Sequence, residues 1–258
     1  MTEGKRLPTN TFAAASDAYA LARPSYPPSL FEWVAAQSPG TEAVWDCATG
    51  NGQAAVGLAA HFRRVEASDI TPEQVRHGKA RPNIHYSAQP AEGTEFAEAS
   101  FDAVTVAQAL HWFDFPRFWT EVRRVARPGA LFCAWGYAWF RYGGEVEAAL
   151  VDPVKDLVAP YWAANNRILW DGYRDQETGF PFERIAAPAF ELEHDTDVAG
   201  IAAYVRTWSA FKRASAADPA LAAKLEEVVA GGVETLGAGT RVRAVTPLAV
   251  VAGRVATC

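Results

Sequence analysis

The chain has few cysteines, no long apolar run and no excess of positive charge, and each absence excludes a class of protein. Its three cysteines, Cys47, Cys133 and Cys258, are far apart and form no Cys-x-x-Cys pair, so neither a disulfide framework nor a zinc site is predicted. Cys47 and Cys133 fall inside expected strands, which indicates buried thiols and fits a reducing cytoplasm. No run of about 18 apolar residues occurs, so no membrane span is predicted.

The charge balance and the missing motifs exclude further partners. The net charge of −6 disfavours a nucleic-acid partner, because surfaces that bind nucleic acid are normally basic. The first residues lack the apolar core of a signal peptide, so a cytoplasmic protein is expected. The Gly-Lys-Ser/Thr of a phosphate-binding loop is missing, which disfavours a nucleoside triphosphate. The histidines show no metal-ligand spacing, so no metal is predicted. The oligomeric state cannot be read from the sequence.

Strands and helices alternate along the chain, which predicts an α/β fold. We expect a doubly wound, Rossmann-like sheet of about seven strands, mostly parallel with an antiparallel last strand, and a helical lid inserted after the fifth strand. Further strands are expected at 101–107, near 190–194 and, as the last, at 246–253. The chain (1–258) is interpreted as a single domain made of an N-terminal arm and helix (10–37), a cofactor-binding core (43–136), the inserted lid (137–181) and a C-terminal part of the sheet with helices (182–258).

The most informative segment is 44–53, in which an apolar strand ends in a glycine turn that opens onto an alanine-rich helix. Gly50 and Gly52 have no side chain, so a ligand can approach the backbone closely at this turn. A second strand at 65–69 ends in Asp69, about 20 residues further on, where a carboxylate can reach ribose hydroxyls. This order of elements is typical of the nucleoside-binding half of a doubly wound fold.

Asp46, at the end of the first strand, distinguishes between nucleoside ligands. A dinucleotide would bring its pyrophosphate to the glycine turn, where a carboxylate would repel the negative charge. The positively charged amino-acid end and sulfonium of S-adenosylmethionine would instead be attracted. The alternative is that Asp46 only caps the turn.

Several segments together resemble the class I S-adenosylmethionine-dependent methyltransferases. The superfamily likeness lies in 46–52 (Asp-Cys-Ala-Thr-Gly-Asn-Gly), in Asp69, in 101–106 and in 127–131. Three further segments are similar to small-molecule methyltransferases related to trans-aconitate methyltransferase: 19–27, 108–114 (Gln-Ala-Leu-His-Trp-Phe-Asp) and 206–209. The likeness covers roughly residues 10–254.

The resemblance implies S-adenosylmethionine as the cofactor, S-adenosylhomocysteine as its product and a small molecule as the methyl acceptor. It implies that Asp69 bonds the ribose hydroxyls and that Ile70 packs on the adenine. Where the family usually has an aspartate for the adenine amino group, this chain has Pro90, so Gln89 or backbone groups beside Ala91 would take that role. The other implied cofactor contacts are Asp46, Ala48, Gly50 and Gly52 at the methionine and ribose, Gln108 at the methionine, and Tyr19 with Arg23 as a clamp on the carboxylate.

His111 is the candidate general base. It follows the fourth strand, at the edge of the sheet where the substrate and the methyl group would meet, and an ordinary imidazole can remove a proton near neutral pH. The alternative is that His111 holds the loop that carries Trp112. A base is required only for an acceptor that arrives protonated, such as a hydroxyl, and a carboxylate acceptor requires none.

Two other functions stay open on the sequence. Gly50, Gly52 and Asp69 also permit an NAD(P)-dependent oxidoreductase, against which Asp46 argues. The departure at Pro90 permits a module that binds the cofactor without turnover. The expectation that ranks first is methyl transfer to a small molecule, with a carboxylate or a hydroxyl as the favoured acceptor.

Overall fold

A computed structural model describes residues 25–256, and at its centre is a seven-stranded sheet with the order β3-β2-β1-β4-β5-β9-β6. Neighbouring strands from β3 to β5 pair in parallel, whereas β9 lies antiparallel between β5 and β6. The predicted mostly parallel sheet of about seven strands with an antiparallel last strand is therefore confirmed. Its strands are β1 (Ala43–Cys47), β2 (Arg64–Asp69), β3 (Ile84–Ala88), β4 (Phe101–Ala107), β5 (Ala126–Gly136), β6 (Glu183–Arg184) and β9 (Ala249–Arg254).

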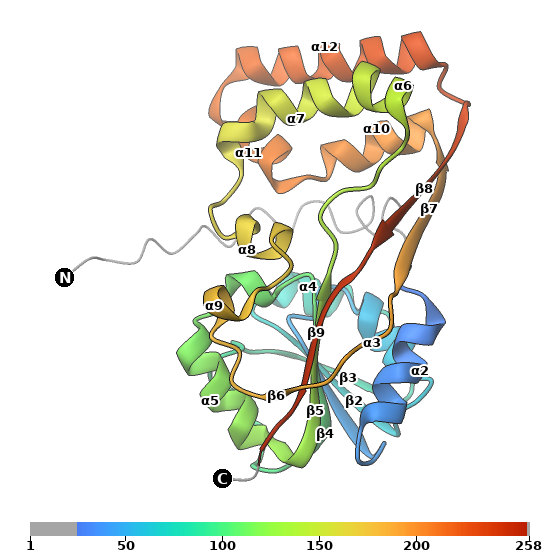
Figure 1. The fold of residues 1–258 in the computed structure, drawn as a ribbon. Coiled ribbons are helices and arrows are strands. Elements are labelled where there is room, and N and C mark those ends of the chain that lie inside the picture. The colour runs from blue at the N-terminus through green and yellow to red at the C-terminus, as the bar shows by residue number, and fades with distance from the viewer. Residues whose placement is uncertain (1–24, 257–258) are drawn as a thin grey trace, which may run out of the picture.

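Helices cover both faces of this sheet (Figure 1). α2 and α3 lie on one face, and α5 lies on the other. Every residue of β1 is buried, because this central strand is covered from both sides. The helices next to the sheet are α2 (Pro28–Gln37), α3 (Gln53–Leu58), α4 (Pro72–Arg76) and α5 (Phe115–Val125), with the short 3₁₀ turn η3 (Leu110–Trp112) before α5.

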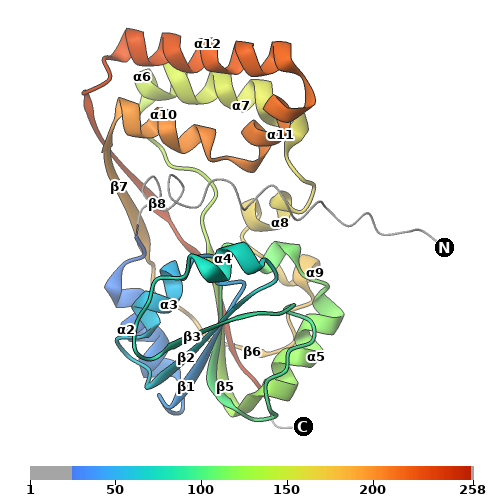
Figure 2. The same cartoon turned by 180° about the vertical axis from the view of Figure 1, so that it is seen from behind.

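A second layer of helices stands beyond the carboxyl ends of the parallel strands (Figures 1 and 2). Two separate parts of the chain build it, since α12 packs against both η4 and α7. The two-stranded sheet β7–β8 connects this layer to the rest of the molecule. The elements of this layer and of its connection to the sheet are α6 (Gly144–Val146), η4 (Glu147–Val151), α7 (Asp152–Val158), η5 (Ala159–Tyr161), α8 (Asn166–Trp170), β7 (Glu191–Asp197), α10 (Val198–Arg206), α11 (Ser209–Ala217), α12 (Pro219–Leu236) and β8 (Arg241–Pro247). The short helix α9 (Asp175–Thr178) lies instead beside α5.

The bounds of the last strand were predicted wrongly. The expected strand at 246–253 is divided into β8 and β9, and the division falls at Leu248, directly after Pro247. Pro247 still pairs with Glu191, and Leu248 donates its N–H to the carbonyl oxygen of Phe190, so the chain changes partner only after Leu248, where β9 begins to pair with β5. The strand predicted near 190–194 exists as β7, but it pairs with β8 rather than with the main sheet.

No helix within residues 25–256 has both the length and the apolar character that a crossing of the bilayer needs.

Candidate active site

The turn after β1 has a left-handed backbone, which glycine adopts at no steric cost. Ala48, Gly50 and Gly52 have φ angles of +54°, +59° and +84°. A Cβ atom on Gly52 would lie 1.9 Å from the hydroxyl oxygen of Tyr86, whereas the nearest atom to a Cβ on Gly50 would be 4.0 Å away. Two features therefore require glycine at position 52, namely its positive φ and the closeness of the Tyr86 ring. At Gly50 only the positive φ requires glycine.

Asp69 ties the end of β2 to this turn. One of its carboxylate oxygens accepts the N–H of Gly50 at 3.0 Å, and the other accepts the N–H of Thr71 at 2.9 Å. A carboxylate offers about four lone-pair directions, so acceptor capacity is left for hydroxyl groups of a ligand. The next residue, Ile70, has 62% of its surface exposed, which is exceptional for a large aliphatic side chain.

Asp46 is completely buried but is not in apolar surroundings. Its two oxygens accept hydrogen bonds from the hydroxyls of Thr49, in the turn, and Thr105, on β4. Burial raises the pKa of this carboxyl to about 6, because removal from water penalises the charged form. None of the ion pairs within residues 25–256 includes Asp46, so its carboxylate is held by the two hydroxyls and by a backbone hydrogen bond from Ala55.

The segment after β3 carries the residues implied for adenine. The side-chain amide of Gln89 donates to Ser87 at 2.8 Å, and its oxygen accepts the N–H of Glu95 at 2.9 Å. Ala91 is buried. Because the Gln89 amide already bonds within its own loop, a direct contact with adenine stays a prediction.

Gln108 joins the ends of β4 and β5. Its backbone has a φ of +58°, and its side-chain amide bonds the carbonyl oxygen of Tyr137 at 3.2 Å and the N–H of Tyr137 at 3.3 Å. A Cβ atom on Gly136 would lie 2.9 Å from the Gln108 amide oxygen. Gln108 is thus held at the carboxyl edge of the sheet. It follows β4, which is the neighbour of β1, the strand that leads into the glycine turn.

His111 is buried, with 3% of its surface exposed. Its Nδ1 lies 3.3 Å from the hydroxyl oxygen of Tyr173, and its carbonyl oxygen accepts from the side chain of Asn165 at 3.0 Å. Burial lowers the pKa of the imidazole from 6.5 to about 4. Such a neutral, weakly basic group suits holding the loop better than removing a proton at neutral pH, so the general base stays a prediction that the geometry does not favour.

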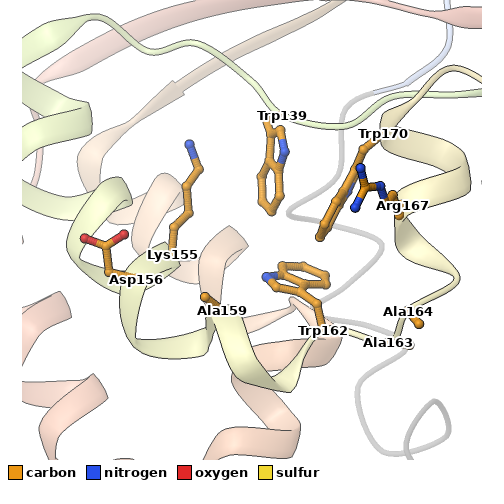
Figure 3. A pocket seen from close by; sticks show the side chains of 9 residues that line it. All are labelled: Trp139, Lys155, Asp156, Ala159, Trp162, Ala163, Ala164, Arg167 and Trp170. Carbon is orange, nitrogen blue, oxygen red and sulfur yellow. The ribbon is translucent and has the colours of Figure 1, made fainter.

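An open pocket lies between α7 and α8 (Figure 3), with a cavity volume of about 600 Å³. Three tryptophans surround it, and two cations and one acid stand at its sides. Three alanines complete the lining. The tryptophans are Trp139, Trp162 and Trp170, the cations are Lys155 and Arg167, and the acid is Asp156.

The structure brings the predicted turn, Asp46, Asp69, Ile70 and Gln108 to one edge of the sheet. Tyr19 and Arg23 lie outside the described residues, so the clamp stays a prediction. Sequence reasoning missed Thr105 and Tyr86, which come from other strands. It predicted the lid segment (137–181) but not the pocket that the tryptophans of this segment form.

Comparisons with known proteins agree with this geometry. Residues 45–134 match the family model described as a methyltransferase domain. An uncharacterised methyltransferase of Mycobacterium tuberculosis is 33% identical over 184 residues, which are 67% of this chain and 75% of the relative. A candidate methyltransferase of Dictyostelium discoideum is 26% identical over 80% of this chain and 81% of its own length. The solved structure of a candidate type II methyltransferase from Anaeromyxobacter dehalogenans is 37% identical, covers 92% of this chain and 99% of its own, and has a TM-score of 0.80.

Proposed function

Since the chain belongs to the class I S-adenosylmethionine-dependent methyltransferases, we propose that it methylates a small organic acceptor, with a carboxylate favoured over a hydroxyl. Family membership removes the nicotinamide-dependent oxidoreductase from the alternatives. A module that binds the cofactor without turnover stays as the alternative that an activity measurement tests. Similarity to the trans-aconitate type remains part of the proposal.

The observation that carries this proposal is the pair of acids around one glycine turn. Asp46 is a buried carboxyl with no cationic partner among the described residues, and its burial raises its pKa to about 6. A positively charged ligand at the turn would stabilise the ionised form. Asp69 and the exposed Ile70 fit the ribose and the adenine of the same ligand. These residues therefore suit an adenosyl group with a cationic amino-acid end.

The residues would act mainly by alignment. S-adenosylmethionine, when bound, supplies a methyl group on a positively charged sulfur. That methyl group would pass to an acceptor oxygen as its bond to sulfur breaks, and the electron pair of that bond would stay on sulfur. Alignment of reacting atoms contributes up to about 7–11 kcal/mol. The chain's part is to hold the adenosyl group with Asp69 and the turn, and to exclude water with the buried loop around His111.

The state of His111 bears on the acceptor. A hydroxyl acceptor must lose its proton, whereas a carboxylate is already ionised at neutral pH. With a pKa of about 4, His111 would accept such a proton poorly. This supports the proposal of a carboxylate acceptor, with His111 positioning the loop between β4 and α5.

We expect calorimetric titration to detect binding of S-adenosylhomocysteine to the protein, and Asp69→Ala to weaken it about tenfold to hundredfold. The physical reason is that hydrogen bonds to charged groups contribute about 1.5–3 kcal/mol. Asp195→Ala is the matched control, because Asp195 is an acid at the surface that pairs with Arg241 far from the turn. Circular dichroism checks that each variant is folded. An unchanged dissociation constant in Asp69→Ala would contradict the assignment of this acid.

A further inference from the structure

The three indole rings of the α7–α8 pocket pack against one another and form one aromatic wall of the pocket. The ring of Trp139 lies 5.3 Å from that of Trp162, at an interplanar angle of 85°, and 5.4 Å from that of Trp170, at 38°. Trp162 and Trp170 are 5.5 Å apart at 80°. Trp170 keeps 36% of its surface exposed, which is unusual for tryptophan. Walls of this kind suit a flat, unsaturated ring more than an aliphatic chain.

The charged groups beside the indoles select the sign of a ligand. The ammonium of Lys155 stands 5.1 Å from the ring centre of Trp139, and Figure 3 shows the guanidinium of Arg167 beside Trp170. Lys155 bonds Asp152 at 3.3 Å, and Arg167 bonds Asp171 through Nε at 3.4 Å. Each cation has more N–H donors than these single bonds use.

The remaining acid does not reverse this preference. Figure 3 shows the carboxylate of Asp156 on the far side of Lys155 from the indoles. Because an ammonium already stands over Trp139, a cationic ligand would meet like charge at the site where an aromatic cage normally attracts it. The arrangement therefore favours an anionic group on the ligand.

The pocket adjoins the candidate active site. Trp139 follows β5 by three residues, and β5 ends beside Gln108. Asn165, which bonds the carbonyl oxygen of His111, directly precedes α8, the helix that supplies Arg167 and Trp170. The pocket thus lies between the helical layer and the edge of the sheet that carries the glycine turn.

We propose that this pocket binds the methyl acceptor and that the acceptor is a planar aromatic acid, with its ring against the wall formed by Trp139, Trp162 and Trp170 and its anionic group at Lys155. The inference rests on the proposed function, whose unspecified small molecule it narrows to one chemical class. A volume of about 600 Å³ is within the usual range for small-molecule sites.

Three probes with the same aromatic ring and different charges test which charge the pocket prefers on its ligand. Isothermal titration calorimetry compares 2-naphthoate, neutral 2-naphthamide and cationic 2-naphthylmethylamine, each with S-adenosylhomocysteine at saturation. We expect 2-naphthoate to bind about tenfold more tightly than either of the others, because a charged hydrogen bond is present in this complex alone. Equal affinity for the acid and the amide, or tighter binding of the amine, would overturn the proposal.

Variants locate the binding. Lys155→Gln should weaken 2-naphthoate about tenfold and leave 2-naphthamide unchanged, and Trp170→Ala should weaken both, with Trp170→Phe retaining most of the affinity. Lys224→Gln is the matched control, since Lys224 forms the same kind of i,i+3 pair with Glu227 on the surface helix α12. Full affinity in both Lys155→Gln and Trp170→Ala would reject the pocket.

Binding of S-adenosylhomocysteine distinguishes a failure of the pocket assignment from a failure of the proposed function. Every pocket variant should bind it with unchanged affinity, since no pocket residue belongs to the glycine turn. If the product binds and 2-naphthoate does not, the pocket assignment fails while the proposed function stands. If S-adenosylhomocysteine fails to bind to the unmodified protein, the proposed function fails, whatever the naphthalene probes do.

Discussion

Gly52→Ala should lower the free energy of unfolding by about 2–5 kcal/mol. An alanine at a φ of +84° costs about 1–2 kcal/mol by itself. Its Cβ would also stand 1.9 Å from the Tyr86 hydroxyl oxygen, and overpacking of this kind adds about 1–3 kcal/mol. Tyr86 cannot move away freely, because a Cβ on Gly78 would lie only 2.7 Å from the same ring. Urea unfolding followed by circular dichroism measures the change.

Gly50→Ala separates the two contributions to this loss. Gly50 also has a positive φ, but a Cβ there would meet its nearest atom at 4.0 Å, so it should lose only the backbone contribution of about 1–2 kcal/mol. Combining Gly52→Ala with Tyr86→Phe removes the nearest clashing oxygen and should recover part of the stability. Equal destabilisation in Gly50→Ala and Gly52→Ala would show that the Tyr86 contact is not what requires glycine.

His111→Gln should change how stability depends on pH by about 3 kcal/mol. The folded protein keeps this buried imidazole neutral down to pH of about 4, whereas the unfolded chain takes up the proton near its ordinary pKa of 6.5. The contribution is therefore complete above pH 6.5 and is lost as the pH falls towards 4. The difference in unfolding free energy between the protein and His111→Gln, measured by urea denaturation from pH 7.5 to 4, should shrink by that amount.

Asp46 has the opposite effect on the pH dependence of the unfolding free energy. Its folded pKa of about 6 exceeds the ordinary 3.8, so its contribution is complete below pH 3.8 and is lost as the pH rises through 6. The protein itself can thus show a shallow pH profile that conceals two opposing slopes. Tyr173→Phe is the control. It keeps the buried His111, so its unfolding free energy should depend on pH as that of the unmodified protein does. A His111→Gln profile parallel to that of the unmodified protein would mean that the imidazole is not held neutral by burial.

The sequence predicted the strands that carry strong local signals. β1 and β4 are apolar runs bounded by turns, and both are buried. β6 has only two residues, both exposed, so it offers no apolar pattern to detect. The division between β8 and β9 depends on the change of partner after Leu248, which a pattern of apolar residues does not reveal.

The candidate site was predictable where it is contiguous. Gly50 and Gly52 stand two residues apart, and Asp69 follows at a characteristic distance, so one pass along the chain finds them. The contact between Asp46 and Thr105 joins residues 59 positions apart on neighbouring strands. The burial that lowers the basicity of His111 likewise comes from packing by Tyr173, another distant residue. Such contacts exist only once the chain has folded.

The position of β9 has a consequence for biosynthesis. This strand occupies the place between β5 and β6, although it is the last of the described strands to be translated. A nascent chain that has not yet released residues 249–254 from the ribosome presents the edge of β5 unpaired, and free strand edges pair readily with other chains. Protection by chaperones should therefore be needed until residues 249–254 have left the ribosome and paired with β5.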